Sequence, residues 1–146
     1  MVTGADIFNK ALQDANAWLN EVAGDLDADR HRAYHALRAV LHATRDRLSV
    51  RECHALAAQL PMLVRGLYFD GYTPAGKPLD TDLLPAVAEN LRDGQPLDPE
   101  DAARAVFRLL DGNVARGQIE DVKQQLPTDA FILWPKRVAG SRRDSS

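Results

Sequence analysis

Apolar residues recur along most of the chain at intervals of three and four positions, with polar residues between them. This spacing places the apolar side chains on one face of an α-helix. No long stretch alternates apolar and polar residues as a half-buried β-strand does. The pattern therefore predicts an all-α fold. The expected helices are 6–23, 28–48, 50–58, 61–69, one from Leu83 to Leu91, one from Pro99 past Leu110, 117–125, and one that starts at Pro127 and ends before Pro135.

The helix expected over residues 6–23 carries a long apolar stripe. The steps of three and four between its members are those of a single helical face. Gly24 and the acidic residues after it end the helix. The members of the stripe are Ile7, Phe8, Ala11, Leu12, Ala15, Leu19 and Val22, and Trp18 widens it.

Three segments mark the ends of later helices. Ser49 and Glu52 predict a capping box, in which the Ser49 hydroxyl accepts from the Glu52 amide and the Glu52 carboxylate accepts from the Ser49 amide. Asp98 and Pro99 predict a helix start, because aspartate caps a helix and proline suits its first turn. Residues 70–78 hold two glycines and two prolines, which predict a loop.

The clearest long-range feature is an internal repeat. A shift of 66 positions aligns residues 36–69 with residues 102–135 without a gap, and eight of the 34 pairs are identical. Chance would give roughly two or three identities at ordinary residue frequencies. The triplet Gln-Leu-Pro at 59–61 returns at 125–127. Each triplet predicts a corner between two short helices, because proline ends one helix and suits the first turn of the next.

A slip of one position extends the repeat, so that residues 18–23 align with residues 83–88. Each unit then has four helices, two long and two short. The two tandem units are expected to cover each other's apolar faces and to form one pseudo-twofold helical domain. The expected boundaries are 1–135 for the domain, 5–70 for the first repeat, 71–81 for a connecting loop, 82–135 for the second repeat and 136–146 for a disordered basic tail.

Three segments of the first repeat resemble a known family. Residues 37–48 read Leu-Arg-Ala-Val-Leu-His-Ala-Thr-Arg-Asp-Arg-Leu, residues 56–61 read Leu-Ala-Ala-Gln-Leu-Pro and residues 65–72 read Arg-Gly-Leu-Tyr-Phe-Asp-Gly-Tyr. Together they resemble the bacterial "domain of unknown function 2267" family, over about residues 5–135. The resemblance implies a compact helical domain. The family has no established activity, so the resemblance assigns no catalytic residue.

The formal net charge of −3 hides an uneven distribution. The tail holds four basic residues, and the rest of the chain holds 14 basic and 20 acidic residues. An acidic body repels phosphate backbones, so nucleic acid is not an expected partner of the body. The basic residues of the tail are Lys136, Arg137, Arg142 and Arg143.

Cys53 is the only cysteine, so no disulfide can form within the chain, which fits a reducing compartment. No apolar run approaches the roughly 18 residues of a membrane span. The first residues lack the basic and then apolar pattern of a signal peptide. We therefore expect a cytoplasmic protein with no membrane partner. Because Cys53 aligns with Ile119, we interpret it as a buried hydrophobe and not as a nucleophile.

His31 and His35 lie one helical turn apart, a spacing that can bind zinc. No third ligand follows at a suitable spacing, and the cation Arg38 separates His35 from His42 on the same face. We interpret this face as a solvated surface, and we expect no metal and no cofactor. His31 and His35 are the candidates if a metal does bind.

Arg38 and Arg104 occupy equivalent positions of the repeat, among residues that are expected in the core. We expect each to pair with an acidic residue of a neighbouring helix, and the alternative is an anion site at the interface between the repeats. Tyr68, Phe69 and Tyr72 form an aromatic group, which would be a contact surface where it is exposed.

The sequence brings together no acid, base, nucleophile and metal set, so we expect a non-enzymatic protein-interaction module. Its partner would be an unidentified protein or a second copy of the chain, with residues 68–72 as the contact. The first alternative is a ligand- or metal-binding enzyme whose cleft between the repeats holds groups such as Arg38, Arg104 or His35. The second alternative is a nucleic-acid-binding accessory role for the basic tail.

Overall fold

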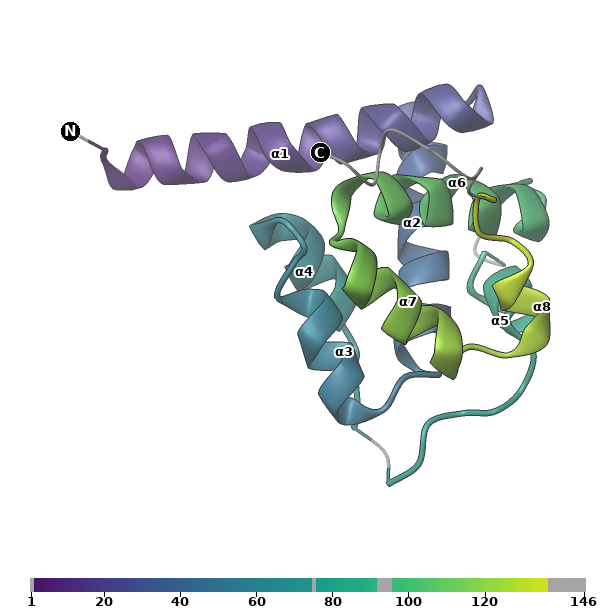
Figure 1. Cartoon of the computed structure of the whole chain (residues 1–146). Helices are drawn as coiled ribbons and strands as arrows, with labels where there is room; N and C mark the ends of the chain where they lie inside the picture. Colours follow the sequence, from purple (N-terminus) through teal and green to yellow (C-terminus); the bar gives the residue numbers. More distant parts are fainter. Residues whose placement is uncertain (1, 75, 92–95, 137–146) are drawn as a thin grey trace.

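A computed structural model describes residues 2–74, 76–91 and 96–136 of the chain (Figure 1). These residues form eight α-helices and no β-strand, which confirms the predicted all-α fold. Of the expected basic tail, only Lys136 lies within the described residues. The helices are α1 (Gly4–Leu26), α2 (Arg30–Arg45), α3 (Val50–Ala57), α4 (Met62–Phe69), α5 (Leu83–Asn90), α6 (Pro99–Asn113), α7 (Arg116–Gln125) and α8 (Thr128–Phe131).

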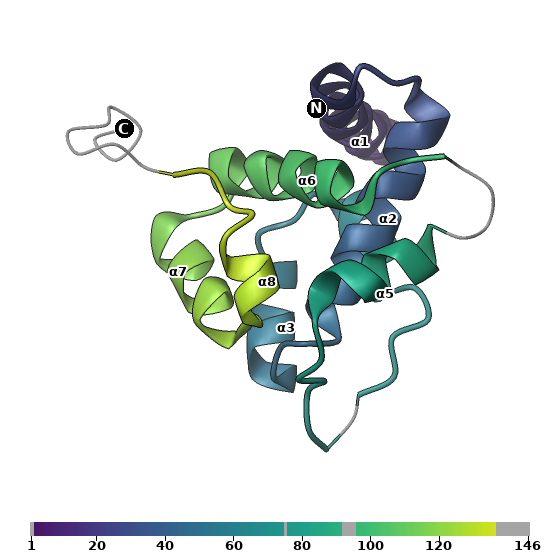
Figure 2. The same ribbon diagram turned by 90° about the vertical axis from the view of Figure 1, so that its right-hand side faces the viewer.

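Helix α2 is the centre of the bundle. Ten of its 16 residues are buried, and it contacts α1, α4, α5 and α6. Helix α1 lies across one end of the bundle, and α3 and α7 lie side by side towards the other end (Figures 1 and 2). Because α2 has neighbours on most sides, its apolar residues spread well beyond one narrow stripe.

The core draws on all eight helices. Helix α6 buries Val106, Phe107 and Leu110, and α7 buries Ile119, as the apolar pattern of the second repeat predicts. The ring of Phe107 stacks on that of Trp134, with 4.2 Å between the ring centroids. Other large side chains with almost no exposed surface are Leu37, Leu41, Leu56, Tyr68, Leu83 and Leu109.

The predicted capping box of α3 forms only in part. The Ser49 hydroxyl accepts a hydrogen bond from the Glu52 amide at 3.1 Å, as expected. The Ser49 amide, however, donates to the side-chain oxygen of Gln125 at 2.8 Å and not to Glu52. The Glu52 carboxylate instead accepts from the side-chain amide of Gln118 on α7. The second half of the prediction is wrong because the neighbouring helix supplies the acceptor that a local capping box would have used.

The two repeated glutamines make the same contact in opposite directions. Gln59 accepts from the backbone amide of Ala115 at 2.7 Å, and Gln125 accepts from that of Ser49 at 2.8 Å. Ser49 and Ala115 are the N-cap residues of α3 and α7, and they are 66 positions apart, as the glutamines are. Each glutamine therefore satisfies an amide at the start of a helix in the other half of the chain.

A second hydrogen bond also recurs after 66 positions. An Nη atom of Arg47 donates to the carbonyl of Ala43 at 2.9 Å, and Nδ2 of Asn113 donates to the carbonyl of Leu109 at 2.7 Å. Both bonds reach back four residues, to a carbonyl near the end of α2 or α6. Different side chains thus satisfy the same backbone group in the two halves.

Glutamine variants test whether the two reciprocal contacts are equivalent. We expect Gln59→Ala and Gln125→Ala each to lower the free energy of unfolding by about 1 kcal/mol, because each leaves one helix-start amide without its acceptor. Chemical denaturation measures both effects. Gln124→Ala is the control, since Gln124 is exposed and its neighbour makes the contact. Strongly unequal effects of the two substitutions would argue against equivalent contacts.

The first half of α1 extends beyond the rest of the bundle (Figure 1). Residues 2–10 are all exposed, and the buried residues of α1 are Ala11, Trp18 and Val22. In the sequence repeat, residues 18–23 align with the start of α5, so residues 4–17 of α1 have no counterpart in the second half. No helix of the described ranges has both the length and the apolar content that a membrane crossing requires.

Candidate interaction surface

The protruding half of α1 exposes a row of large apolar side chains, here called the α1 stripe. Phe8 is 70% exposed, Leu12 53% and Ile7 48%. These residues belong to one helical face, which the sequence pattern alone does not distinguish from a core face. The stripe is exposed because α1 continues past the end of the bundle.

An apolar groove between α1, α2 and α4 continues the α1 stripe. Leu12, Ala15 and Leu19 follow one another on the same face of α1 at steps of three and four, so the exposed residues lead directly into the groove. The groove encloses about 140 Å³. It is lined by Ala15, Leu19, Tyr34, Leu37, Leu63, Val64 and Leu67.

The polar residues beside the α1 stripe carry opposite charges. Lys10 and Asp14 form an ion pair along α1, with 3.1 Å between Nζ and the carboxylate oxygen. Both side chains are well exposed, so the pair adds little to the stability of the helix. Because each is two positions from Leu12, both charges lie on the side of α1 that faces away from Leu12.

The aromatic group that the sequence suggested as a contact surface is only partly exposed. Tyr68 is completely buried, and its hydroxyl donates to the carbonyl oxygen of Cys53 at 2.9 Å and lies 3.3 Å from its sulfur. This burial raises the pKa of the Tyr68 hydroxyl well above its usual range. The suggested contact through Tyr68 is therefore wrong. Phe69 and Tyr72 are half-buried and lie against the exposed His54 ring.

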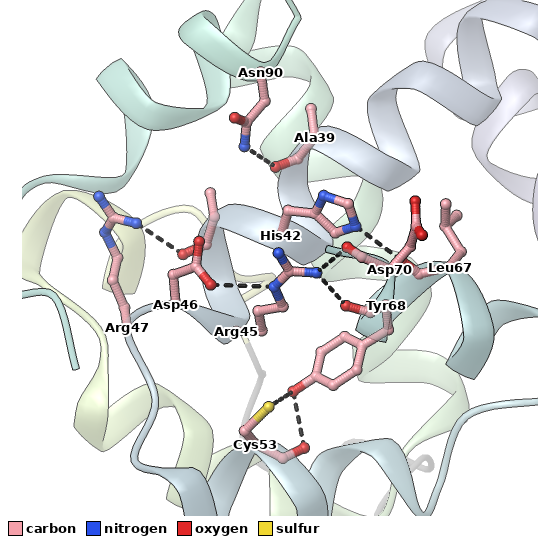
Figure 3. A network of polar contacts seen from close by, with 11 residues as sticks. Ala39, His42, Arg45, Asp46, Arg47, Cys53, Leu67, Tyr68, Asp70 and Asn90 are labelled. Carbon is pink, nitrogen blue, oxygen red and sulfur yellow. Dashed lines mark hydrogen bonds and ion pairs between the residues drawn. The ribbon is translucent and has the colours of Figure 1, made fainter. Parts of the chain in front are cut away.

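A buried arginine holds this aromatic segment in place (Figure 3). The guanidinium of Arg45 donates to the carbonyl of Tyr68 at 2.6 Å and to that of Asp70 at 2.7 Å. Its Nε donates to the Asp46 carboxylate at 3.1 Å. The guanidinium carbon also lies 5.5 Å from the centre of the Tyr72 ring. Arg45 thus joins the end of α2 to the carbonyl groups at the end of α4, which lack partners within their own helix.

A histidine makes a parallel connection. Nε2 of His42 donates to the carbonyl of Leu67 at 2.8 Å, and the side chain is buried (Figure 3). Burial lowers the pKa of His42 below its ordinary value of 6.5, because the charged ring loses water. The bond to Leu67 opposes this shift, and the charges of Arg45 and Arg38 reinforce it.

The lowered pKa of His42 predicts a specific pH dependence. As the pH falls below about 6.5, the unfolded chain takes up a proton at this position before the folded chain does, so the free energy of unfolding should decrease. We expect the contribution to be complete above about pH 6.5 and to be lost below it. Chemical denaturation of the unsubstituted chain and of His42→Gln over this range measures the difference.

The control for this prediction is His31→Gln, which replaces an exposed histidine of the same helix. It should keep the pH dependence of the unsubstituted chain, whereas His42→Gln should weaken it. Parallel curves for the unsubstituted chain and His42→Gln would contradict the role of His42.

The suggested zinc ligands lie close together on the surface. The rings of His31 and His35 meet edge to face, with 4.6 Å between their centroids, and Tyr34 lies 5.2 Å from His35. Within the described residues, no group of three or more histidine, cysteine, aspartate or glutamate side chains is arranged to hold a metal ion. The structure therefore adds no third ligand to the two histidines.

Arg38 and Arg104 have different surroundings, although they occupy equivalent positions of the repeat. Arg38 is partly buried on α2, whereas the Arg104 side chain on α6 is 44% exposed. Arg104 pairs with Glu100 of its own helix at 3.2 Å, so the expected pairing with a neighbouring helix is wrong for this residue. Glu100 lies four positions before Arg104, so the two side chains share one face of α6 and pair with each other.

Two surfaces were not identified from the sequence. The sequence pattern predicts that the α1 stripe is apolar but does not predict that it is exposed. The repeat does contain a sign of this exposure, since residues 4–17 have no second copy. The second surface combines Arg104 with Arg116, Lys123 and residues after α8. Its members come from α6, α7 and the residues after α8, so only the fold shows that these segments are neighbours.

A comparison with protein-family models matches residues 15–133 to a family described as "Uncharacterized conserved protein (DUF2267)". The match covers most of the chain and agrees with the resemblance noted from the sequence. Ile7, Phe8 and Leu12 precede the matched residues. No curated protein matches the chain.

Proposed function

The chain belongs to the DUF2267 family of uncharacterized conserved proteins, and from this premise we propose that it is a non-enzymatic protein-interaction module that self-associates through α1. The observation that carries the proposal is the α1 stripe with its adjoining groove. Contiguous exposed apolar surface of this kind is typical of protein contacts. His42 and Tyr68, whose pKa values are shifted by burial, are engaged in hydrogen bonds that connect helices, which supports a structural role for them.

We also propose that the body of the protein is one domain of two tandem repeats about a pseudo-twofold axis. The support is the reciprocal contact of Gln59 and Gln125 with the opposite helix starts. In a twofold arrangement, when one residue contacts a second, the equivalents make the same contact in reverse. The contacts of α1 with α6 and of α2 with α5 fit this pattern, as do those of α2 with α6 and α3 with α7.

The repeat explains why α1 is available for another role. The second half completes its four-helix unit with α5, whose eight residues correspond to the end of α1. Residues 4–17 are not required to complete a four-helix unit. These 14 helical residues make α1 about 21 Å longer. A helix segment with an apolar face and no partner within its own domain requires a partner elsewhere.

A second copy of the chain fits the α1 stripe because the surface is complementary to itself. In an antiparallel pair of α1 helices centred near Gln13, Ile7 of one copy lies opposite Leu19 of the other. The exposed side chains of each copy would then enter the groove of its partner. One twofold contact would therefore cover both stripes and both grooves.

Sedimentation equilibrium of the full chain over a range of concentrations tests this function. We expect a reversible monomer–dimer equilibrium, and we expect a chain that begins at Ala11 to remain monomeric. The shortened chain should keep its helical circular dichroism per residue, because residues 2–10 are exposed. A full chain that is monomeric at about 100 μM would exclude stable self-association. A dimer that survives the truncation would exclude the α1 stripe as its interface.

The same module is proposed to act in the cytoplasm. Cys53 is a free thiol that lies fully buried in the core, an arrangement that suits a reducing compartment. Its sulfur packs against the hydroxyl of Tyr68.

A further inference from the structure

The groove beside α1 depends on a short helix for one of its walls. Leu63, Val64 and Leu67 of α4 line this groove together with residues of α1 and α2. Helix α4 has only eight residues, of which Val64 and Tyr68 are buried. A short helix with few buried side chains opens at a lower free energy than the centre of a bundle does. The shape of the groove therefore depends on how firmly α4 is held against its neighbours.

A histidine of α2 holds α4 at the groove. Nε2 of His42 donates to the carbonyl of Leu67, and the side chain of Leu67 lines the groove (Figure 3). His42 is only 7% exposed, so its ring has little contact with water while α4 is in place. This bond therefore joins the central helix of the bundle to the wall of the groove.

Two arginines share the face of α2 that carries His42. Arg38 precedes His42 by four positions and Arg45 follows it by three, so each lies about one helical turn away. Their positive charges oppose protonation of His42, whereas the carboxylate of Asp46 favours it. All three charged groups belong to α2 or to its C-cap residue, and among the described residues α4 contributes the carbonyl of Leu67.

A proton on His42 conflicts with the position of its ring. The Leu67 carbonyl accepts from the neutral and from the charged ring, so this bond by itself favours the charged form. Burial, reinforced by the two arginines, outweighs the bond and lowers the pKa of His42 below its ordinary value of 6.5. A charged ring regains water when α4 moves away from α2. Acid therefore favours a state in which α4 is open.

We propose that His42 is an acid-sensitive switch that keeps α4 in place as a wall of the groove at neutral pH and releases it in acid. The consequence for dimers rests on the proposed self-association, in which the groove receives Ile7 and Phe8 of the partner. An open α4 leaves the groove without one wall, so a dimer forms from copies in which α4 is closed. Acidification should therefore favour the monomer.

Hydrogen exchange of the α4 amides tests the switch without a dimer. The chain is the double variant Ile7→Glu and Phe8→Glu, and the rates are corrected for the intrinsic effect of pH on exchange. Between about pH 7.5 and about pH 5.5, we expect the opening constant of α4 to increase several-fold, up to about tenfold, because a ring in water is then about nine-tenths protonated. Adding His42→Gln should remove this increase, since glutamine keeps a donor but does not titrate.

Sedimentation equilibrium of the full chain at the same two pH values tests the consequence for self-association. We expect the dissociation constant to increase by about threefold or more at the lower pH, because each dimer needs two copies with a closed α4. The dissociation constant of His42→Gln should be the same at both pH values. His31→Gln is the control, since it replaces an exposed histidine of the same helix and should respond to pH as the unsubstituted chain does.

The two measurements separate the switch from the proposed function. A full chain that is monomeric at the higher pH contradicts self-association, and the exchange of the α4 amides then decides whether His42 is a switch. Exchange that does not respond to pH, or that responds equally with His42→Gln, overturns the switch. A dissociation constant that stays constant while α4 opens in acid overturns the role of the switch in self-association.

Discussion

Replacing both Ile7 and Phe8 with glutamate should make the chain monomeric at concentrations where the unsubstituted chain is a dimer. The two side chains are 48% and 70% exposed in the single chain. In the antiparallel pair they enter the groove of the partner, where a carboxylate would lose its water without gaining a partner. We expect the dissociation constant to increase by roughly a hundredfold or more, the effect of losing central apolar contacts. Light scattering coupled to size-exclusion chromatography measures the change.

The same substitutions should leave the monomer intact. Neither side chain contributes to the buried core, so the unfolding midpoint of the monomer should change little. Leu79→Glu is the matched control, because Leu79 is 52% exposed and lies in the loop before α5, away from α1. A control that dissociates the dimer equally well, or a double variant that remains dimeric, would contradict the proposed interface.

Replacing Arg45 with methionine should destabilise the fold strongly. The substitution keeps much of the apolar part of the side chain but removes the donors to the carbonyls of Tyr68 and Asp70. Arg45 is 6% exposed, so water does not readily replace these donors. We expect the free energy of unfolding to decrease by about 3 kcal/mol, since a buried charged contact is broken and its partners stay buried. Chemical denaturation measures this loss.

A control and an intermediate substitution make the Arg45 result specific. Arg51→Met removes an exposed arginine of α3 and should change the stability by less than about 0.5 kcal/mol. Arg45→Lys should fall between the control and the methionine variant, because lysine keeps the charge but cannot reach several acceptors at once. Equal stability of Arg45→Met and the unsubstituted chain would show that this contact does not hold α4 in place.

The helices could be predicted from the sequence because their causes are local. Periodic apolar residues and helix-capping residues act within a few positions, and all eight expected helices are present in the described residues. The burial of Cys53 could also be predicted, because its equivalent in the repeat is Ile119 and both lie in the core. Proline at 61 and 127 precedes a short helix in each half, as the repeated triplet predicts.

The predictions that were wrong concern side chains whose partners are distant in the sequence. Glu52 has the spacing of a capping residue, but Gln125, distant in the sequence, supplies the acceptor. Tyr68 lies near half-buried aromatic residues in the sequence, but it is itself fully buried and its hydroxyl donates to Cys53 of α3. The apolar stripe of α1 has the same periodicity whether it faces a core or a partner. Only the folded structure shows where along α1 the contact with the core ends.

The most direct test of self-association through α1 is a spin-label distance measurement between two copies of the full chain. In the antiparallel pair, labels introduced by Gln13→Cys should lie about 10 Å apart at the backbone, while labels introduced by Gly4→Cys should lie roughly 30 Å apart. Both positions are exposed, and the native Cys53 is buried and should not react. Absence of coupling at position 13, or short distances at both positions as in a parallel pair, would contradict the proposed arrangement.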